Sequence, residues 1–206
     1  MKTALGFFLA CLASLALAET VAPDALVKMI TDDVAAAIRK DADIRGGDTR
    51  KAADLIEAKI VPHFNFTRMA RIAMARNWRS ATPEQQKELA AQFKTLLIRT
   101  YSTALTNYRD QEIDYKPLRA KADDTEVTVK SDVKPTGATQ PVSIDYELEK
   151  TDNGWKIYDV KVDGISLVTT YRETFNTEVR EHGIDGLIKS LAAKNREPQS
   201  AKAGKS

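Results

Sequence analysis

A serine in the segment Gly164-Ile165-Ser166-Leu167-Val168 is the first candidate for chemistry. A hydrolase nucleophile elbow needs Gly-x-Ser-x-Gly, and Val168 stands where the second glycine belongs. A serine nucleophile also needs a base, and the chain has only two histidines, His63 and His182. We therefore predict that Ser166 is the N-cap of a helix and that the chain has no catalytic residue of this kind.

The sequence has few residues that could bind a metal ion or act as a catalytic thiol. Two lone histidines do not form the ligand spacing of a zinc site, and we expect no metal and no cofactor. We expect His63 to be structural and His182 to lie at a helix C-terminus, where a cation is favoured. The single cysteine, Cys11, lies in the amino-terminal 18 residues. Without them, the chain has no cysteine, which excludes disulfides and thiol catalysis.

Acid–base catalysis is a further alternative. An apolar pocket can raise the pKa of a carboxylate enough for general acid or base work, with Asp145, Asp159 or Tyr146 as the candidates. Each aspartate alternates with apolar neighbours, however, so we expect both to point away from the apolar side of a strand.

The charge balance does not indicate nucleic acid binding. The chain has 31 Lys and Arg against 29 Asp and Glu, and the basic residues are spread along it. Three of them, Arg79, Lys161 and Arg172, are candidates for contact with an anionic headgroup or an acidic partner, although solvated charge is the commoner explanation.

The amino terminus has the features of a secretory signal peptide. A short positive start precedes an apolar run from Leu5 to Leu17, and Ala16-Leu17-Ala18 is a small-x-small cleavage site. The run is shorter than the roughly 20 residues that span a bilayer. We expect cleavage after Ala18 rather than lipidation at Cys11, and hence an exported, soluble chain. Residues 19–194 are expected to form one domain, with a disordered tail over 195–206.

Helices are expected first. Leu26, Ile30, Val34 and Ile38 recur every four residues behind Pro23, and a second helix starts near Asp48 and ends at Val61-Pro62. A third, short helix carries Met69. Thr82-Pro83-Glu84-Gln85 forms a capping box with proline at the first helical position, and a long helix follows.

Strands are expected next, because the apolar period changes to two beyond Tyr108. We expect strands around 113–115, 127–133, 142–148 and 155–162, with a hairpin turn at Asp152-Asn153-Gly154. In the last strand, Trp155 and Ile157 would occupy one face and Tyr158, Val160 and Val162 the other. A helix from about Ser166 would stop at His182-Gly183, and a short helix from Asp185 would follow.

Several motifs resemble the MlaC / toluene-tolerance family of periplasmic phospholipid-binding proteins. They are the strand–turn–helix segment Trp155–Phe175, the stretch Pro62-His63-Phe64-Asn65-Phe66, and Ala75-Arg76-Asn77-Trp78-Arg79-Ser80-Ala81-Thr82-Pro83-Glu84-Gln85. Asn65 replaces the family's usual Asp and Ala75 its usual Gly. The resemblance extends over roughly Ala22–Leu191.

The resemblance implies an α+β fold: a curved antiparallel sheet of about four strands, related to nuclear-transport-factor-2-like folds, with helices from both ends of the chain enclosing an apolar pocket. It also implies a carrier that shuttles phospholipid between an outer-membrane lipoprotein complex and an inner-membrane ABC transporter complex, and so maintains outer-membrane lipid asymmetry. The acyl chains would be buried and the headgroup solvated.

Such a carrier must shield the acyl chains from water. A diacyl phospholipid exposes roughly thirty methylenes, which cost on the order of 20 kcal/mol in water at about 0.8 kcal/mol each. We expect the acyl chains to contact apolar and aromatic side chains, each of which could equally belong to an ordinary core. The candidates are Phe66, Met69, Leu97, Tyr101, Val129, Ile144, Tyr146, Val160 and Tyr171. The alternatives are a pocket enzyme of the same shape and a periplasmic interaction module with a solid core.

Overall fold

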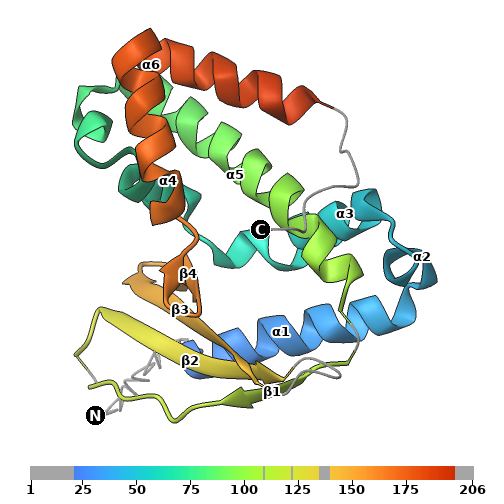
Figure 1. The fold of residues 1–206 in the computed structure, drawn as a ribbon. Coiled ribbons are helices and arrows are strands. Elements are labelled where there is room, and N and C mark those ends of the chain that lie inside the picture. The colour runs from blue at the N-terminus through green and yellow to red at the C-terminus, as the bar shows by residue number, and fades with distance from the viewer. Residues whose placement is uncertain (1–20, 109, 122, 135–139, 198–206) are drawn as a thin grey trace, which may run out of the picture.

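The protein combines one antiparallel sheet with helices from both ends of the chain, which confirms the expected α+β class (Figure 1). The structure, a computed structural model, describes residues 21–108, 110–121, 123–134 and 140–197. The sheet has five strands in the order β1-β2-β3-β4-β5, one more than expected, because two residues after β4 form a short edge strand. The strands are β1 (Glu112–Tyr115), β2 (Glu126–Lys134), β3 (Val142–Thr151), β4 (Gly154–Val162) and β5 (Ile165–Ser166).

The helices begin where the local sequence indicates. Asp48 caps α3 by accepting hydrogen bonds from the Arg50 and Lys51 amides at 2.9 and 3.0 Å. Thr82 and Gln85 form the expected reciprocal capping box of α5. The helices are α1 (Pro23–Lys40), α2 (Ala42–Arg45), α3 (Thr49–Lys59), α4 (Phe66–Met74), α5 (Pro83–Thr106) and α6 (Arg172–Arg196), with 3-10 turns η1 (Val61–His63), η2 (Ala75–Ser80) and η3 (Thr169–Tyr171).

A β-bulge in β4 makes the expected face assignment of that strand wrong. Leu148 pairs with Ile157, but its neighbour Glu147 pairs with Asp159, so Tyr158 is an extra residue without a partner. The inserted residue reverses the alternation beyond it. Val160 therefore shares the face of Ile157 and joins the same apolar cluster, instead of occupying the opposite face.

The segment after β4 also differs from expectation. Ser166 belongs to β5, and the helical region starts later, with η3 followed by α6 at Arg172. The Ser166 hydroxyl still accepts a hydrogen bond from the Thr169 amide at 3.0 Å, but the turn that it supports is not the first turn of α6.

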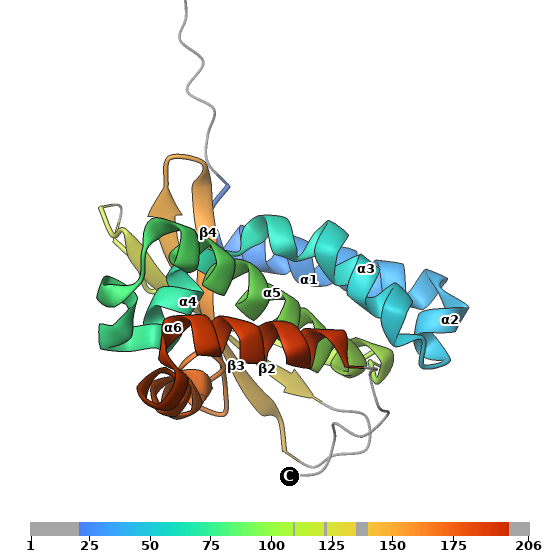
Figure 2. The same ribbon diagram turned by 90° about the horizontal axis from the view of Figure 1, so that it is seen from above.

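The C-terminal helix α6 bends at Gly183, where φ is 69° and ψ is −179°. The expected stop at His182-Gly183 is thus confirmed as a sharp kink, after which a second helical segment continues (Figure 2). That segment includes Asn195, whose side-chain amide donates to the backbone and side-chain oxygens of Gln92 at 2.9 and 2.8 Å. The prediction of disorder from residue 195 is therefore wrong at its start, and residues 198–206 lie outside the described residues. The expected signal peptide, 1–18, lies outside them as well.

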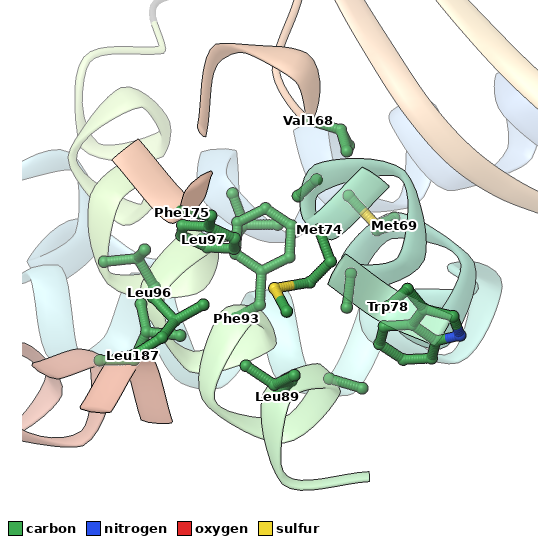
Figure 3. Packing of buried hydrophobic residues seen from close by; sticks show 14 of the residues in the cluster. Met69, Met74, Trp78, Leu89, Phe93, Leu96, Leu97, Val168, Phe175 and Leu187 are labelled. Carbon is green, nitrogen blue, oxygen red and sulfur yellow. The ribbon is translucent and has the colours of Figure 1, made fainter. Parts of the chain in front are cut away.

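The apolar interior is divided into clusters. One lies among α4, η2, α5 and α6, with Phe93 in contact with Phe175 at a ring-centroid distance of 5.3 Å (Figure 3). A second lies between α1 and the sheet, where Leu26, Val27 and Ile30 of α1 pack with strand residues. A third joins the C-terminal part of α1 to α2 and α3. None of the described helices combines the length and the apolar character that crossing a membrane requires.

Candidate functional site

An apolar cavity of about 360 Å³ lies between α1, the end of α5 and the sheet. This volume is at the lower end of the range for ligand pockets, about 300–1,000 Å³. Its wall is formed by Val27, Ile30, Thr31, Val34, Ala35, Ile38, Ile60, Phe64, Ala104, Leu105, Tyr108, Gln111, Ile113, Val133, Ile144, Tyr146 and Ile157. No charged side chain is among these described lining residues, so the site favours hydrocarbon over an ionic group.

The cavity exists because α1 covers only part of the sheet. Near its start, α1 packs directly on the sheet through Val27 and Ile30. Towards its end, Ile38 turns instead to α2 and α3. The sheet residues that face this second half, Val133 and Ile144, are only partly buried and line the cavity. A void with apolar walls stays dry and accepts apolar ligands.

Two of the nine residues expected to contact acyl chains, Ile144 and Tyr146, line this cavity. Val129 and Val160 lie on the same face of the sheet but belong to the cluster under the first half of α1. The remaining five, Phe66, Met69, Leu97, Tyr101 and Tyr171, belong to or pack against the cluster of α4, α5 and α6. Lipid contact by each of the nine stays a prediction.

Most of the wall was missed by reasoning from the sequence, although one signal for it was present. The stripe Leu26, Ile30, Val34 and Ile38 was recognised as one face of a helix, and three of its four residues line the cavity. Phe64, which is joined to Ile157 by an isolated β-bridge, could be placed at the wall only by long-range pairing.

The polar atoms of the cavity wall are bonded within the protein. The Thr31 hydroxyl donates to the Val27 carbonyl at 2.9 Å and also contacts the Tyr115 hydroxyl. Tyr146 hydrogen-bonds with Ser131, a buried residue of β2, and burial raises the pKa of Tyr146 to about 12. The phenol therefore stays neutral near pH 7, which suits an apolar wall and does not suit a general base.

The three basic residues expected to meet a headgroup or a partner do not gather at the cavity. Lys161 binds Glu147 at 2.7 Å on the outer face of the sheet. Arg172 donates to the Ile72 carbonyl at 3.2 Å, and Arg79 is exposed in η2. Their proposed contacts with a headgroup or a partner therefore stay predictions.

Neither of the two candidate catalytic aspartates lines the cavity. Asp159, 6% exposed, accepts hydrogen bonds from the Ser166 hydroxyl at 2.5 Å and from the Val160 and Val168 amides at 2.9 and 3.2 Å. Asp145 alternates with two cavity residues and lies opposite Lys161 in the β3–β4 register, so it points to the other face. Within the described ranges, no group of three or more His, Cys, Asp or Glu residues could hold a metal ion.

Comparisons with known proteins agree with this architecture. A family model described as MlaC protein matches residues 28–193. The intermembrane phospholipid transport system binding protein MlaC of Haemophilus influenzae is 22% identical over 185 residues, which are 89% of this chain and 86% of the relative. The toluene tolerance protein ttg2D of Pseudomonas putida is 35% identical over 108 residues, 52% of this chain and 49% of the relative.

A solved structure has a similar fold. The phospholipid-binding protein from Ralstonia solanacearum, determined in complex with a phospholipid, superposes with a TM-score of 0.77 at 47% identity. The match covers 84% of this chain and 96% of that chain. Because the family model spans most of the sequence and the fold agrees, the chain belongs to the MlaC family.

Proposed function

We propose that this protein binds a phospholipid with acyl chain hydrocarbon in the cavity between α1 and the sheet, and carries it through the periplasm between the two membranes. The observation that supports this most directly is an apolar, uncharged cavity in a chain that is 47% identical to a protein solved with a phospholipid. Hydrocarbon burial of about 0.8 kcal/mol per methylene supplies the affinity. The headgroup stays at the solvent, and so the carrier needs no charged side chain inside.

The wider system is part of the same proposal. By family membership, lipid passes between an outer-membrane lipoprotein complex and an inner-membrane ABC transporter complex, which maintains outer-membrane lipid asymmetry. The exported chain begins at Glu19. Mass spectrometry of the mature protein tests whether Glu19 is its first residue. A lipidated chain that begins at Cys11 would contradict this proposal.

Neither alternative fits the geometry as well. A pocket enzyme would need an acid or base inside the cavity, but Asp145 and Asp159 lie on the opposite face of the sheet. Tyr146 does line the cavity, but burial raises its pKa to about 12, which does not suit a general base near pH 7. An interaction module with a solid core does not account for an interior space of about 360 Å³.

Co-purified lipid is the decisive test. The protein is purified without detergent, extracted with organic solvent and analysed by mass spectrometry, with a variant that fills the cavity, Ile144→Trp, processed in parallel. We expect phospholipid in the wild-type extract and less in the variant. A wild-type extract free of phospholipid, together with no uptake from phospholipid vesicles, would overturn the proposal.

A further inference from the structure

The strand β2 extends well beyond its neighbour β1. Pairing with β1 covers Ser131–Lys134, and one more bond joins the Lys116 amide to the Lys130 carbonyl at 2.9 Å. On the other side, pairing with β3 begins as early as Glu126. The first part of β2, Glu126–Val129, therefore has one paired edge and one edge that β1 leaves uncovered.

Local sequence explains why β1 stops. Pro117 has no amide hydrogen and cannot continue the ladder. The next residue, Leu118, packs against the apolar cluster between α1 and the sheet, which draws the chain away from the line of the strand. In an antiparallel ladder every second residue directs its backbone groups to the same neighbour. Because Lys130 faces β1, Thr128 faces the uncovered side, and no described backbone group bonds to it there.

A cleft of about 730 Å³ lies at this uncovered edge. Its lining combines the edge residues Glu126, Val127 and Thr128 with charged groups that include Arg119, Lys130 and Glu147. This cleft is separate from the apolar cavity, because the two share no lining residue.

The charges of the cleft are unequally neutralised. Glu126 binds Arg68 at 2.6 Å, and Glu147 binds Lys161 at 2.7 Å, so both carboxylates already have cationic partners. Arg119 makes no ion pair with any residue that the structure describes, and Lys130 reaches only Asp145, at 3.7 Å. The cleft therefore offers cationic groups to an incoming ligand beside an open strand edge.

We propose that this edge binds an extended, acidic peptide segment of a partner protein, which adds to the sheet beside Glu126–Val129. The backbone of such a segment supplies the ladder bonds that β1 does not make. Its carboxylates pair with Arg119 and Lys130. Four residues of strand span about 13 Å, which matches the uncovered length of β2.

The test uses isotope-labelled protein and a capped seven-residue peptide that alternates glutamate and valine. We expect amide chemical shift changes confined to 116–119 and 126–130 at about 1 mM peptide, where even weak binding gives visible occupancy. Arg119→Glu is expected to weaken binding about tenfold, the equivalent of about 1.4 kcal/mol. Arg76→Glu, the same charge reversal on an exposed arginine in η2, should leave it unchanged.

Two further peptides separate strand addition from simple charge attraction. The same peptide with alternate amides N-methylated keeps its carboxylates but cannot complete the ladder, and a lysine–valine peptide keeps the ladder but reverses the charge. We expect neither to bind. Equal binding of the N-methylated peptide, shift changes elsewhere on the protein, or no changes with the glutamate–valine peptide would each overturn the proposal.

Discussion

The hydroxyl of Ser166 donates a hydrogen bond to the carboxylate of Asp159 at 2.5 Å, across the turn that joins β4 to β5. The same carboxylate accepts the Val168 amide, and the Ser166 oxygen accepts the Thr169 amide. The pair therefore ties the approach to α6 to the sheet. A serine that resembles a nucleophile in sequence is thus a structural tie in the fold.

Removing this tie is expected to destabilise the protein. Asp159→Ala leaves a part-buried hydroxyl and two amides without their acceptor, and we expect a loss of about 3 kcal/mol in the free energy of unfolding. Ser166→Ala removes fewer bonds and should cost about 1 kcal/mol. Denaturant titration measures both. Asp54→Ala, an exposed aspartate on α3, serves as the control and should change stability by less than about 0.5 kcal/mol. A small loss for Asp159→Ala would contradict the structural role.

Asn65 occupies a position where an aspartate would be unfavourable in this chain. Its side-chain oxygen accepts the Arg68 amide at 3.0 Å, and its side-chain nitrogen donates to Glu149 at 2.7 Å. Asn65→Asp keeps the helix cap but places a second carboxylate next to that of Glu149. We expect this repulsion to lower the free energy of unfolding by about 1–3 kcal/mol.

A double-mutant cycle isolates this repulsion. In a Glu149→Gln background the charge that opposes residue 65 is absent, so the additional cost of Asn65→Asp should fall to less than half. Thermal or denaturant unfolding of the four proteins provides the measurement. An unchanged cost in that background would show that the repulsion is not the cause.

Ala75 adopts a backbone conformation that favours glycine. Its φ is 48° and its ψ is −124°, at the junction of α4 and η2. A Cβ atom in such a region costs about 1–3 kcal/mol, part of which the greater chain entropy of glycine offsets. Ala75→Gly should therefore raise the free energy of unfolding by about 1 kcal/mol. Ala73→Gly, two residues earlier in α4, should lower stability, and a loss in both variants would contradict the strain at Ala75.

Ile144 and Val129 separate the cavity from the packed core. Both project from the same face of the sheet, but Ile144 lines the cavity and Val129 is 1% exposed under α1. Ile144→Trp should fill the empty space, reduce the phospholipid load and cost less than about 1.5 kcal/mol in stability. Val129→Trp overpacks a filled site and should cost about 1–3 kcal/mol or more. Lipid quantitation and denaturant unfolding of both variants test the distinction, and an unchanged load in Ile144→Trp would exclude this cavity.

Alkaline pH is expected to weaken the fold through partly buried phenols. Burial raises the pKa of Tyr146, and separately that of Tyr101, to about 12. A raised pKa means that the native state favours the neutral phenol. This stabilisation is complete below the ordinary pKa of about 10 and is lost as the pH rises through 12. Near-ultraviolet phenolate absorbance should show tyrosines that ionise above the ordinary pKa in the folded protein but not in the denatured protein. Between pH 10 and pH 12, the Tyr146→Phe variant should lose less stability than the wild type. An equal loss in both proteins would mean that Tyr146 does not cause the alkaline destabilisation.

Local interactions were readable from the sequence alone. The capping box of Thr82 and Gln85 forms within four residues, and the turn before Gly154, where φ is 89°, needs only the conformational freedom of glycine. The strand alternation in β3 and the stripe on α1 likewise follow from periodicity. These features depend on neighbours in sequence, and each was confirmed.

Tertiary structure decided what long-range packing controls. The bulge at Tyr158 depends on how β4 pairs with β3, and it moved Val160 to the face opposite to the one that alternation predicts. Alternation also puts Val129 and Ile144 on one face, but it cannot say which of them a helix will cover. The path of α1 over the sheet determines that, because its first half packs against Val129 and its second half leaves Ile144 at the wall of an open space.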